Sequence, residues 1–148
     1  MRHGHSPSAS ESGVKSDALR PLSDQGRDDS RRMAAEVARR GGQPALILHS
    51  PLLRAVRTAE AAADVLKTQA RVFAPLDNTL PPQEALELLK DRAAEADDVL
   101  AVGHQPQLGE IAALLTGAVL DIRPACVVAL ELEPQPRLLW TANVDELG

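Results

Sequence analysis

The order of apolar and amphipathic segments is the feature that most constrains this chain. Residues 44–50 (PALILHS) and 98–104 (DVLAVGH) are short continuous apolar runs, typical of strands buried on both faces of a parallel sheet. Each run leads into a segment with apolar residues at helical spacing. This alternation predicts an α/β fold, a three-layer sandwich with a mostly parallel central sheet flanked by helices. We expect one domain spanning residues 1–148.

The remaining elements follow the same pattern. Ser23 is the expected N-cap of a helix that Gly41-Gly42 stops, and Ser50 with Pro51 is the expected start of the next helix. Residues 5–22, rich in Ser, Asp and Pro, are expected to form a loop. The full set of further expected elements is helices over 24–40, 51–66, 81–96 and 108–116, and strands over 70–75, 126–133 and 137–144.

Composition excludes several classes of function. The chain has a net charge of -5, and Phe73 and Trp140 are its only aromatic residues, so it lacks the charge and stacking groups of a nucleic-acid binder. No apolar run is long enough to span a bilayer or to serve as a secretory leader. Cys126, the only cysteine, permits no intrachain disulfide. We expect a cytoplasmic protein with neither nucleic-acid nor membrane partners.

Polar side chains follow the apolar runs where each predicted strand ends. His49-Ser50 ends one strand, with Arg54 one turn into the next helix, and Gly103-His104 ends another. Ligands of open α/β sheets bind just beyond the carboxyl ends of the strands. If Arg2-His3 followed a third strand, these side chains would share one pocket. Two guanidiniums would repel a metal cation but suit a phosphate dianion, so we expect no metal and no cofactor, and a metal-binding protein is the weakest alternative.

The order of these motifs resembles that of the histidine phosphatase superfamily, which has a phosphoglycerate-mutase-like fold. The segments that carry the resemblance are RHGHS (2–6), LRPLSDQGRDDSRRMA (19–34), ILHSPLLRAVRTAE (47–60) and VLAVGHQPQLGEIAALL (99–115). The stretch RPLSDQG (20–26) matches the pattern R-P-L-[ST]-x-x-G of the SixA-type phosphohistidine phosphatases. The resemblance therefore implies a SixA-type enzyme.

By this resemblance the chain is a metal-independent phosphohistidine phosphatase. His3 is the nucleophile that carries a transient phosphoryl group, and the carbonyl of Gly4 holds the other nitrogen of its ring. The other implied site residues are Arg2, Arg54 and His104, which clamp the phosphoryl oxygens, and Arg20, which contacts phosphate or substrate. The implied partner is a phosphohistidine-bearing protein, and the implied state is a monomer.

The leaving group separates the substrate classes. Relatives that act on phosphate esters carry an acidic residue that serves as general acid, in the segment between the S-P-x-x-R motif and the second histidine of the site. In this chain Glu84 and Asp77 are the candidates in that segment. An imidazole leaving group, with a pKa of about 6.5, needs less help from an acid. The absence of a clear acid favours phosphohistidine. The alternatives are a small-molecule phosphomonoesterase or mutase of the same superfamily, or a non-catalytic phosphate-binding or interaction module.

The position of the RHG motif departs from the family pattern. In the family this motif follows a buried strand of about five apolar residues, whereas only Met1 precedes Arg2 here. We therefore expect the first central strand to be missing or truncated and His3 to be loosely held. We also expect Met1 to be an internal or mis-assigned start, and a form with an apolar extension to be more stable and more active.

Overall fold

The computed structural model describes residues 1–148 and confirms the α/β class. The α-helices are α1 (Ala9–Ser12), α2 (Asp24–Arg39), α3 (Leu53–Leu66), α4 (Pro82–Ala93) and α5 (Gln107–Thr116). The strands are β1 (Leu46–His49), β2 (Gln69–Val72), β3 (Val99–Val102), β4 (Val127–Glu131) and β5 (Arg137–Ala142). Three short 3-10 helices are η1 (Asp17–Leu19), η2 (Ala74–Leu76) and η3 (Val144–Glu146).

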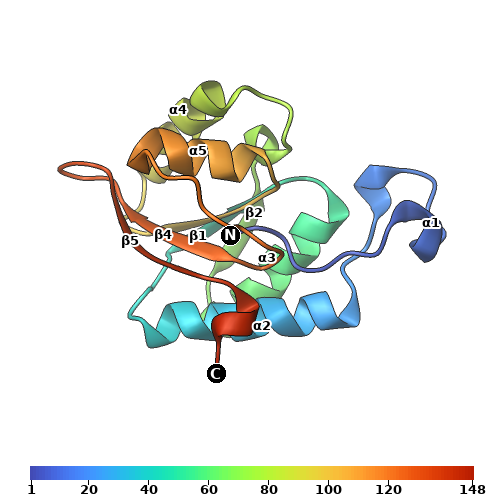
Figure 1. Ribbon diagram of the computed structural model, residues 1–148. Coiled ribbons are helices and arrows are strands. Elements are labelled where there is room, and N and C mark those ends of the chain that lie inside the picture. The colour runs from blue at the N-terminus through green and yellow to red at the C-terminus, as the bar shows by residue number, and fades with distance from the viewer.

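The strands form a parallel sheet and an antiparallel pair. β1 lies between β2 and β3, and Leu46 pairs with Gln69 on one side and with Val99 on the other. β4 and β5 are antiparallel, with an irregularity between Ala129 and Leu130. Helices α2 and α3 lie on one side of the strands, and α4 and α5 lie on the other (Figure 1). The expected three-layer arrangement is therefore confirmed.

The first residues of the chain connect the two sets of strands. The backbone of Arg2 bridges Gly103 in parallel orientation, and its N–H donates to the carbonyl of Cys126 at 2.9 Å. The N–H of His3 donates to Gly103 at 3.1 Å, and its carbonyl accepts from Ala125 at 3.0 Å. Three residues thus fill a strand position between β3 and the segment entering β4, at the centre of the molecule (Figure 1). The expectation that His3 is loosely held is wrong, because hydrogen bonds hold its backbone on both sides.

The core is aliphatic and lies between the sheet and the pair α2 and α3. Small side chains of α3 allow α2 to approach closely, and dispersion contacts accumulate at this short distance. The buried residues of these two helices in the main cluster are Met33, Ala34, Val37, Ala55, Ala59 and Ala62. This packing gives α3, which carries Arg54, a fixed position relative to the sheet.

The N-terminus of α2 agrees with the expectation from the sequence, whereas that of α3 does not. The Oγ of Ser23 accepts from the N–H of Gly26, so its role as the N-cap of α2 is confirmed. α3 begins at Leu53, not at Pro51. The reason is that the N–H of Ser50 still donates to Val102 at 3.0 Å, which extends the ladder between β1 and β3 by one residue.

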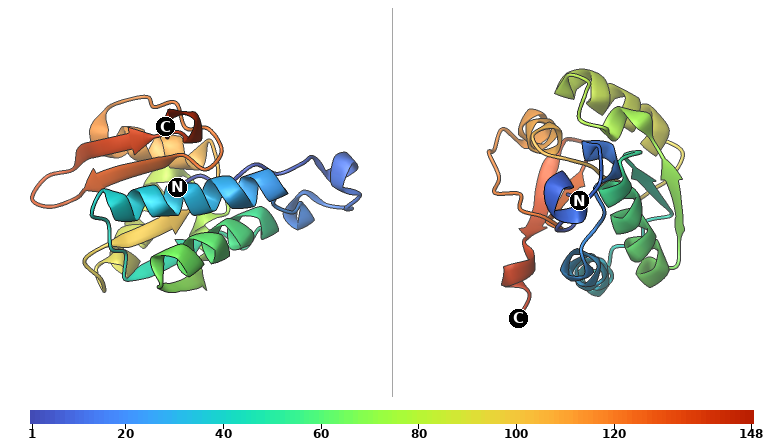
Figure 2. Two further views of the ribbon diagram at one scale, coloured as in Figure 1. Left: turned by 90° about the horizontal axis from the view of Figure 1, so that it is seen from below. Right: turned by 90° about the vertical axis from the view of Figure 1, so that its right-hand side faces the viewer.

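Residues 5–22 contain short helices instead of a plain loop. Ser8 and Glu11 form a capping box at α1, a local signal that sequence analysis missed. α1 and η1 bury no residue, and Figure 2 shows this part projecting beyond the body of the molecule. Likewise the strand expected over 70–75 ends at Val72, where η2 follows. No helix in the structure combines the length and the apolar character needed to cross a membrane.

Candidate active site

A cavity of about 290 Å³ opens at the carboxyl ends of β1 and β3, beside the first residues of the chain. Its lining is polar except for one leucine. The lining residues are Arg2, His3, Asp17, Arg20, Leu52, Arg54, Asp77, Asn78, His104 and Gln105. The structure therefore brings together the five implied site residues Arg2, His3, Arg20, Arg54 and His104, and with them the candidate acid Asp77.

His3 is held in one orientation by its neighbour. Its Nδ1 lies 2.7 Å from the carbonyl oxygen of Gly4. A carbonyl only accepts, so Nδ1 carries the proton and the neutral ring keeps a lone pair on Nε2. The pKa of His3 is lowered to about 3, mainly by burial and to a smaller extent by the nearby His104, Arg54 and Arg2, while the hydrogen bond to Gly4 acts in the opposite direction. The ring is therefore neutral at physiological pH.

Gly4 is required because two backbones touch beside it. A Cβ on Gly4 would lie 2.5 Å from the carbonyl oxygen of Gly26 in α2. A Cβ on Gly26 would lie 2.2 Å from the carbonyl oxygen of His5. The N–H of Gly4 donates to Oγ1 of Thr58 in α3 at 2.9 Å. The turn behind His3 is thus packed against two helices, which limits movement of the ring.

Arg54 is buried and is oriented by Asp17. Its Nη1 donates to the carbonyl of Asp17 at 2.8 Å, and its Nη2 donates to Oδ2 of the same residue at 3.0 Å. Arg20 donates to the other carboxylate oxygen at 3.0 Å. The hydrogen bond from Arg20, followed by that from Arg54, holds the pKa of Asp17 below its usual range. Sequence analysis missed Asp17, although it stands only three residues before Arg20.

Several buried nitrogens on residues that line the cavity have no hydrogen-bond partner in the protein. Arg2 is anchored through Nη1 to the carbonyl of Ile122 at 3.0 Å, but its Nε is buried and unpaired. The same is true of Arg54 Nε and His104 Nδ1. These three are among only five such atoms in the whole structure. Because buried polar groups are rarely left unpaired, this concentration indicates a site for a ligand with several acceptor oxygens.

The ring of His104, the second histidine of the cavity, is also neutral. The centroids of the His104 and His3 rings are 5.1 Å apart. Burial, and then the charge of Arg54, lower the pKa of His104 to about 4. Its Nε2 lies 2.7 Å from Oγ of Ser50. With both rings neutral, the arginines supply the positive charge of the cavity, partly offset by two carboxylates.

The remaining candidates divide between the cavity and its surroundings. Asp77 lines the cavity, with Oδ1 accepting from the N–H of Thr79 at 3.1 Å. Glu84 is exposed on α4 and is not part of the lining. The other two histidines of the chain, His5 and His49, also lie outside the lining. Of the two acids considered from the sequence, only Asp77 lines the cavity.

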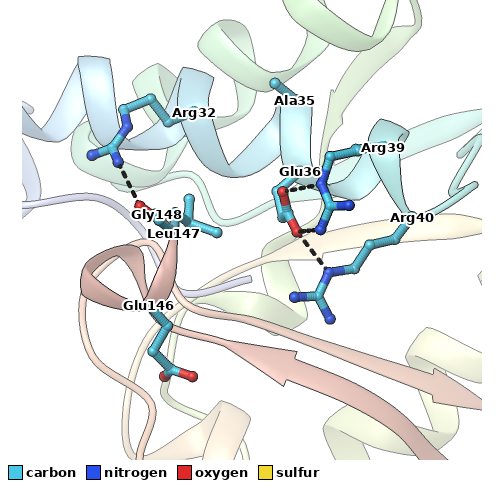
Figure 3. A pocket seen from close by; sticks show the side chains of 8 residues that line it. All are labelled: Arg32, Ala35, Glu36, Arg39, Arg40, Glu146, Leu147 and Gly148. Atoms are coloured by element: carbon cyan, nitrogen blue, oxygen red, sulfur yellow. Dashed lines mark hydrogen bonds and ion pairs between the residues drawn. The ribbon is translucent and has the colours of Figure 1, made fainter.

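A larger hollow of about 500 Å³ lies elsewhere, between α2 and the C-terminal residues (Figure 3). Its arginines already have partners: Arg39 and Arg40 are paired with Glu36, and Arg32 donates to the carbonyl of Leu147 at 3.3 Å. It contains no histidine and no unpaired buried donor. We therefore regard the smaller cavity as the functional site.

Comparison with known proteins agrees with this geometry. The sequence model of the histidine phosphatase superfamily (branch 1) matches residues 1–80, which include the RHG motif and Arg54. This chain belongs to the histidine phosphatase superfamily. An uncharacterised protein of Picosynechococcus sp. is 34% identical over 140 residues, which are 88% of this chain and 81% of that protein.

Solved structures of phosphatases share the fold of this superfamily member. The protein histidine phosphatase SixA complexed with tungstate matches with a TM-score of 0.89 at 26% identity, covering 100% of this chain and 97% of that one. SixA from Agrobacterium tumefaciens matches with a TM-score of 0.83 at 21% identity, over 97% and 94% of the two chains. A mycobacterial glucosyl-3-phosphoglycerate phosphatase matches with a TM-score of 0.69 at 20% identity, over 96% and 97%. Family and fold together support a phosphatase, and hence a hydrolase.

Proposed function

We propose that this chain hydrolyses protein phosphohistidine through a covalent intermediate on His3. The observation that carries the proposal is the set of buried nitrogens without a partner, Arg2 Nε, Arg54 Nε and His104 Nδ1, on residues around one cavity that also holds the His3 ring. A tetrahedral phosphoryl group has enough oxygens to pair with all three nitrogens. No other cluster of side chains in the structure offers such a combination.

The proposed reaction has two displacements at phosphorus. The Nε2 lone pair of His3 attacks the phosphorus, the bond to the substrate nitrogen breaks, and that nitrogen takes up a proton from solvent. Water then attacks the phosphoryl group on His3 and releases inorganic phosphate, with its proton passing to solvent. Arg2, Arg54 and His104 stabilise the charge on the phosphoryl oxygens during both steps. Arg20 contributes further positive charge at the mouth.

The state of the available acid supports an imidazole leaving group. An ester oxygen needs a general acid, which contributes roughly 10²–10⁴-fold to the rate. Asp77 is the one acid at the cavity without an arginine partner, but its Oδ1 is engaged by Thr79. A leaving imidazole is protonated by solvent near neutral pH and does not need this residue.

A small-molecule phosphomonoesterase is the second candidate, and the position of Asp77 favours it. The two functions differ in what Asp77→Asn should do. For an ester substrate the loss of the acid should lower kcat by about 10²-fold. For phosphohistidine the same change should leave kcat within a few-fold of wild type.

The deciding experiment compares turnover of a histidine-phosphorylated carrier protein with that of p-nitrophenyl phosphate. Phosphohistidine should be the better substrate by kcat/KM, and a quenched reaction should contain an acid-labile phosphoryl group on His3. His3→Asn should lose both turnover and label. Label on any other residue, or a preference for the ester, would contradict the proposal. Phosphate binding without any turnover would instead indicate a non-catalytic module.

A further inference from the structure

The hydrogen bond between Ser50 and His104 indicates which nitrogen of the His104 ring carries the proton. The two residues directly follow neighbouring strands, Ser50 after β1 and Gly103-His104 after β3. The N–H of Ser50 donates to the carbonyl of Val102 at 3.0 Å, which fixes the position of Ser50 relative to the residues that follow β3. As a result Oγ of Ser50 lies 2.7 Å from Nε2 of His104. Both residues are buried.

The direction of this hydrogen bond follows from counting protons. A serine hydroxyl has one proton to donate and two lone pairs to accept with. Oγ of Ser50 already accepts from the N–H of Leu52 at 3.1 Å. Its own proton has only one acceptor within reach, which is Nε2 of His104. Because Ser50 is fully buried, solvent offers no substitute, so the hydroxyl donates to the ring.

The consequence for His104 is a defined tautomer. When Nε2 accepts a proton from Ser50, the neutral ring carries its own proton on Nδ1. Nδ1 is the ring atom left without a partner, on a side chain that lines the cavity. In the opposite tautomer Nδ1 would carry a bare lone pair and could not donate to an anion, and the hydroxyl proton of Ser50 would have no acceptor.

We propose that Ser50 is a positioning residue that holds His104 as its Nδ1–H tautomer, and that this N–H donates to a phosphoryl oxygen. The second half of this statement rests on the proposed function. The rings of His3 and His104 are then both protonated on Nδ1, but each uses a different nitrogen toward the phosphoryl group. His3, held by Gly4, keeps a lone pair on Nε2 for phosphorus, while His104, held by Ser50, offers a proton to oxygen.

The first test is made on the wild-type protein, with one variant used only to assign the signals. Histidine ring nitrogens that carry a proton are distinguished from bare ones by NMR of nitrogen-labelled protein near neutral pH, without phosphate. His104 signals are assigned by their loss in His104→Asn. We expect Nδ1 of His104 to be protonated and Nε2 to be bare. A protonated Nε2 in the neutral ring overturns the proposal.

The second test compares two buried hydroxyls. Ser50→Ala should shift the His104 ring toward the Nε2–H tautomer, because Nε2 loses its donor. Ser30→Ala is the matched control: Ser30 is equally buried, but its Oγ donates to the carbonyl of Gly26 at 2.7 Å. That change should leave the His104 signals as in wild type. An unchanged His104 tautomer in Ser50→Ala removes the role assigned to Ser50, and Ser50→Thr, which keeps a hydroxyl, should retain the wild-type tautomer.

The third test uses inorganic phosphate as the probe. Ser50→Ala should weaken phosphate binding about tenfold, as expected for one lost hydrogen bond to an ion. Unchanged phosphate affinity together with an altered tautomer would show that Nδ1–H is not a donor to the ligand. Failure of the proposed function looks different: the wild-type protein would then show the expected tautomer and phosphate affinity but no turnover of a phosphorylated substrate.

Discussion

Arg54 and Asp17 form a two-point contact across the mouth of the cavity, with the guanidinium donating to the backbone carbonyl at 2.8 Å and to the carboxylate at 3.0 Å. Asp17 lies in η1 and Arg54 in α3, so the contact ties the projecting part of the chain to the buried helix. The guanidinium is therefore oriented before any ligand binds. The same contact places a negative charge close to the position proposed for the phosphoryl group.

Asp17→Asn should strengthen the binding of inorganic phosphate. The amide keeps an acceptor for Arg54, and the backbone contact remains, but the charge that opposes an anion is removed. At low salt we expect the Kd for phosphate to fall roughly three- to tenfold, with a smaller gain at high salt because screening weakens the original repulsion. Calorimetric titration measures the Kd for phosphate at both salt concentrations. The exposed Glu87→Gln on α4 is the control and should leave the Kd unchanged; weaker binding by the Asp17 variant would count against this electrostatic reading.

Arg54→Lys should lose about 10²-fold in kcat/KM while the protein remains folded. An ammonium cannot reproduce the planar fork that contacts Asp17 and leaves Nε for the ligand. Arg57→Lys, one turn along the same helix and exposed, should be nearly silent, since its only ion-pair contact is with Glu60 at 4.0 Å. Steady-state kinetics with circular dichroism distinguishes the two. Equal losses in both variants would refute the assignment of Arg54.

Stability should fall as the pH is lowered below neutral. The folded-state pKa values of His3 and His104, about 3 and about 4, lie below that of an unfolded histidine. Between these values and about 6.5 the unfolded chain binds more protons than the folded one, so acid favours unfolding. From about pH 7 to about pH 5 each ring should remove about 2 kcal/mol from the free energy of unfolding.

Urea denaturation at the two pH values measures this effect. His104→Asn should show a smaller loss on acidification than wild type, because one of the two rings is gone. His5→Asn, which removes an exposed ring outside the cavity, is the matched control. If His104→Asn lost as much stability as wild type over this range, the depressed pKa of that ring would be wrong.

Gly26→Ala should destabilise the fold by about 1–3 kcal/mol, the range for overpacking a close contact. The added Cβ would meet backbone atoms of His5, which cannot rotate away. Because the affected segment follows Gly4, the change should also misplace the His3 ring and lower kcat. In Gly148→Ala, the control, the added Cβ meets no atom within 4 Å, so that variant should be as stable and as active as wild type. Thermal unfolding and initial rates report the two effects.

Turnover should be unaffected by EDTA and inhibited by tungstate or vanadate. In the proposed mechanism the arginines of the cavity take the electrostatic role that a divalent ion has in metal-dependent phosphatases. Tungstate and vanadate are expected to bind to the same donors as the phosphoryl group. Loss of activity with the chelator, restored by zinc or magnesium, would show that the arginines are insufficient.

The sequence by itself determined the order of elements and the residues at the strand ends. Apolar runs followed by amphipathic segments led to the parallel sheet with β1 and β3, and the motif order led to His3, Arg54 and His104. These features could be predicted because they depend on the local periodicity of side chains and on one general property of parallel sheets, that their carboxyl ends meet at one edge. Ser23 was recognised as a cap for the same reason, since a cap acts within one turn of its own residue.

Only the tertiary structure decided which distant groups touch. The pairing of Arg54 with Asp17, the contact of Ser50 with His104 and the crossing of Gly4 over Gly26 join residues far apart in the chain. Each depends on how a helix packs against a strand or a turn, which no local pattern encodes. Ser50, the expected N-cap of α3, instead extends the ladder between β1 and β3 through its N–H, which donates to Val102. Hydrogen bonds to Gly103, Ala125 and Cys126 likewise hold the first residues firmly, because neighbouring strands supply the partners that the short N-terminal segment cannot supply itself.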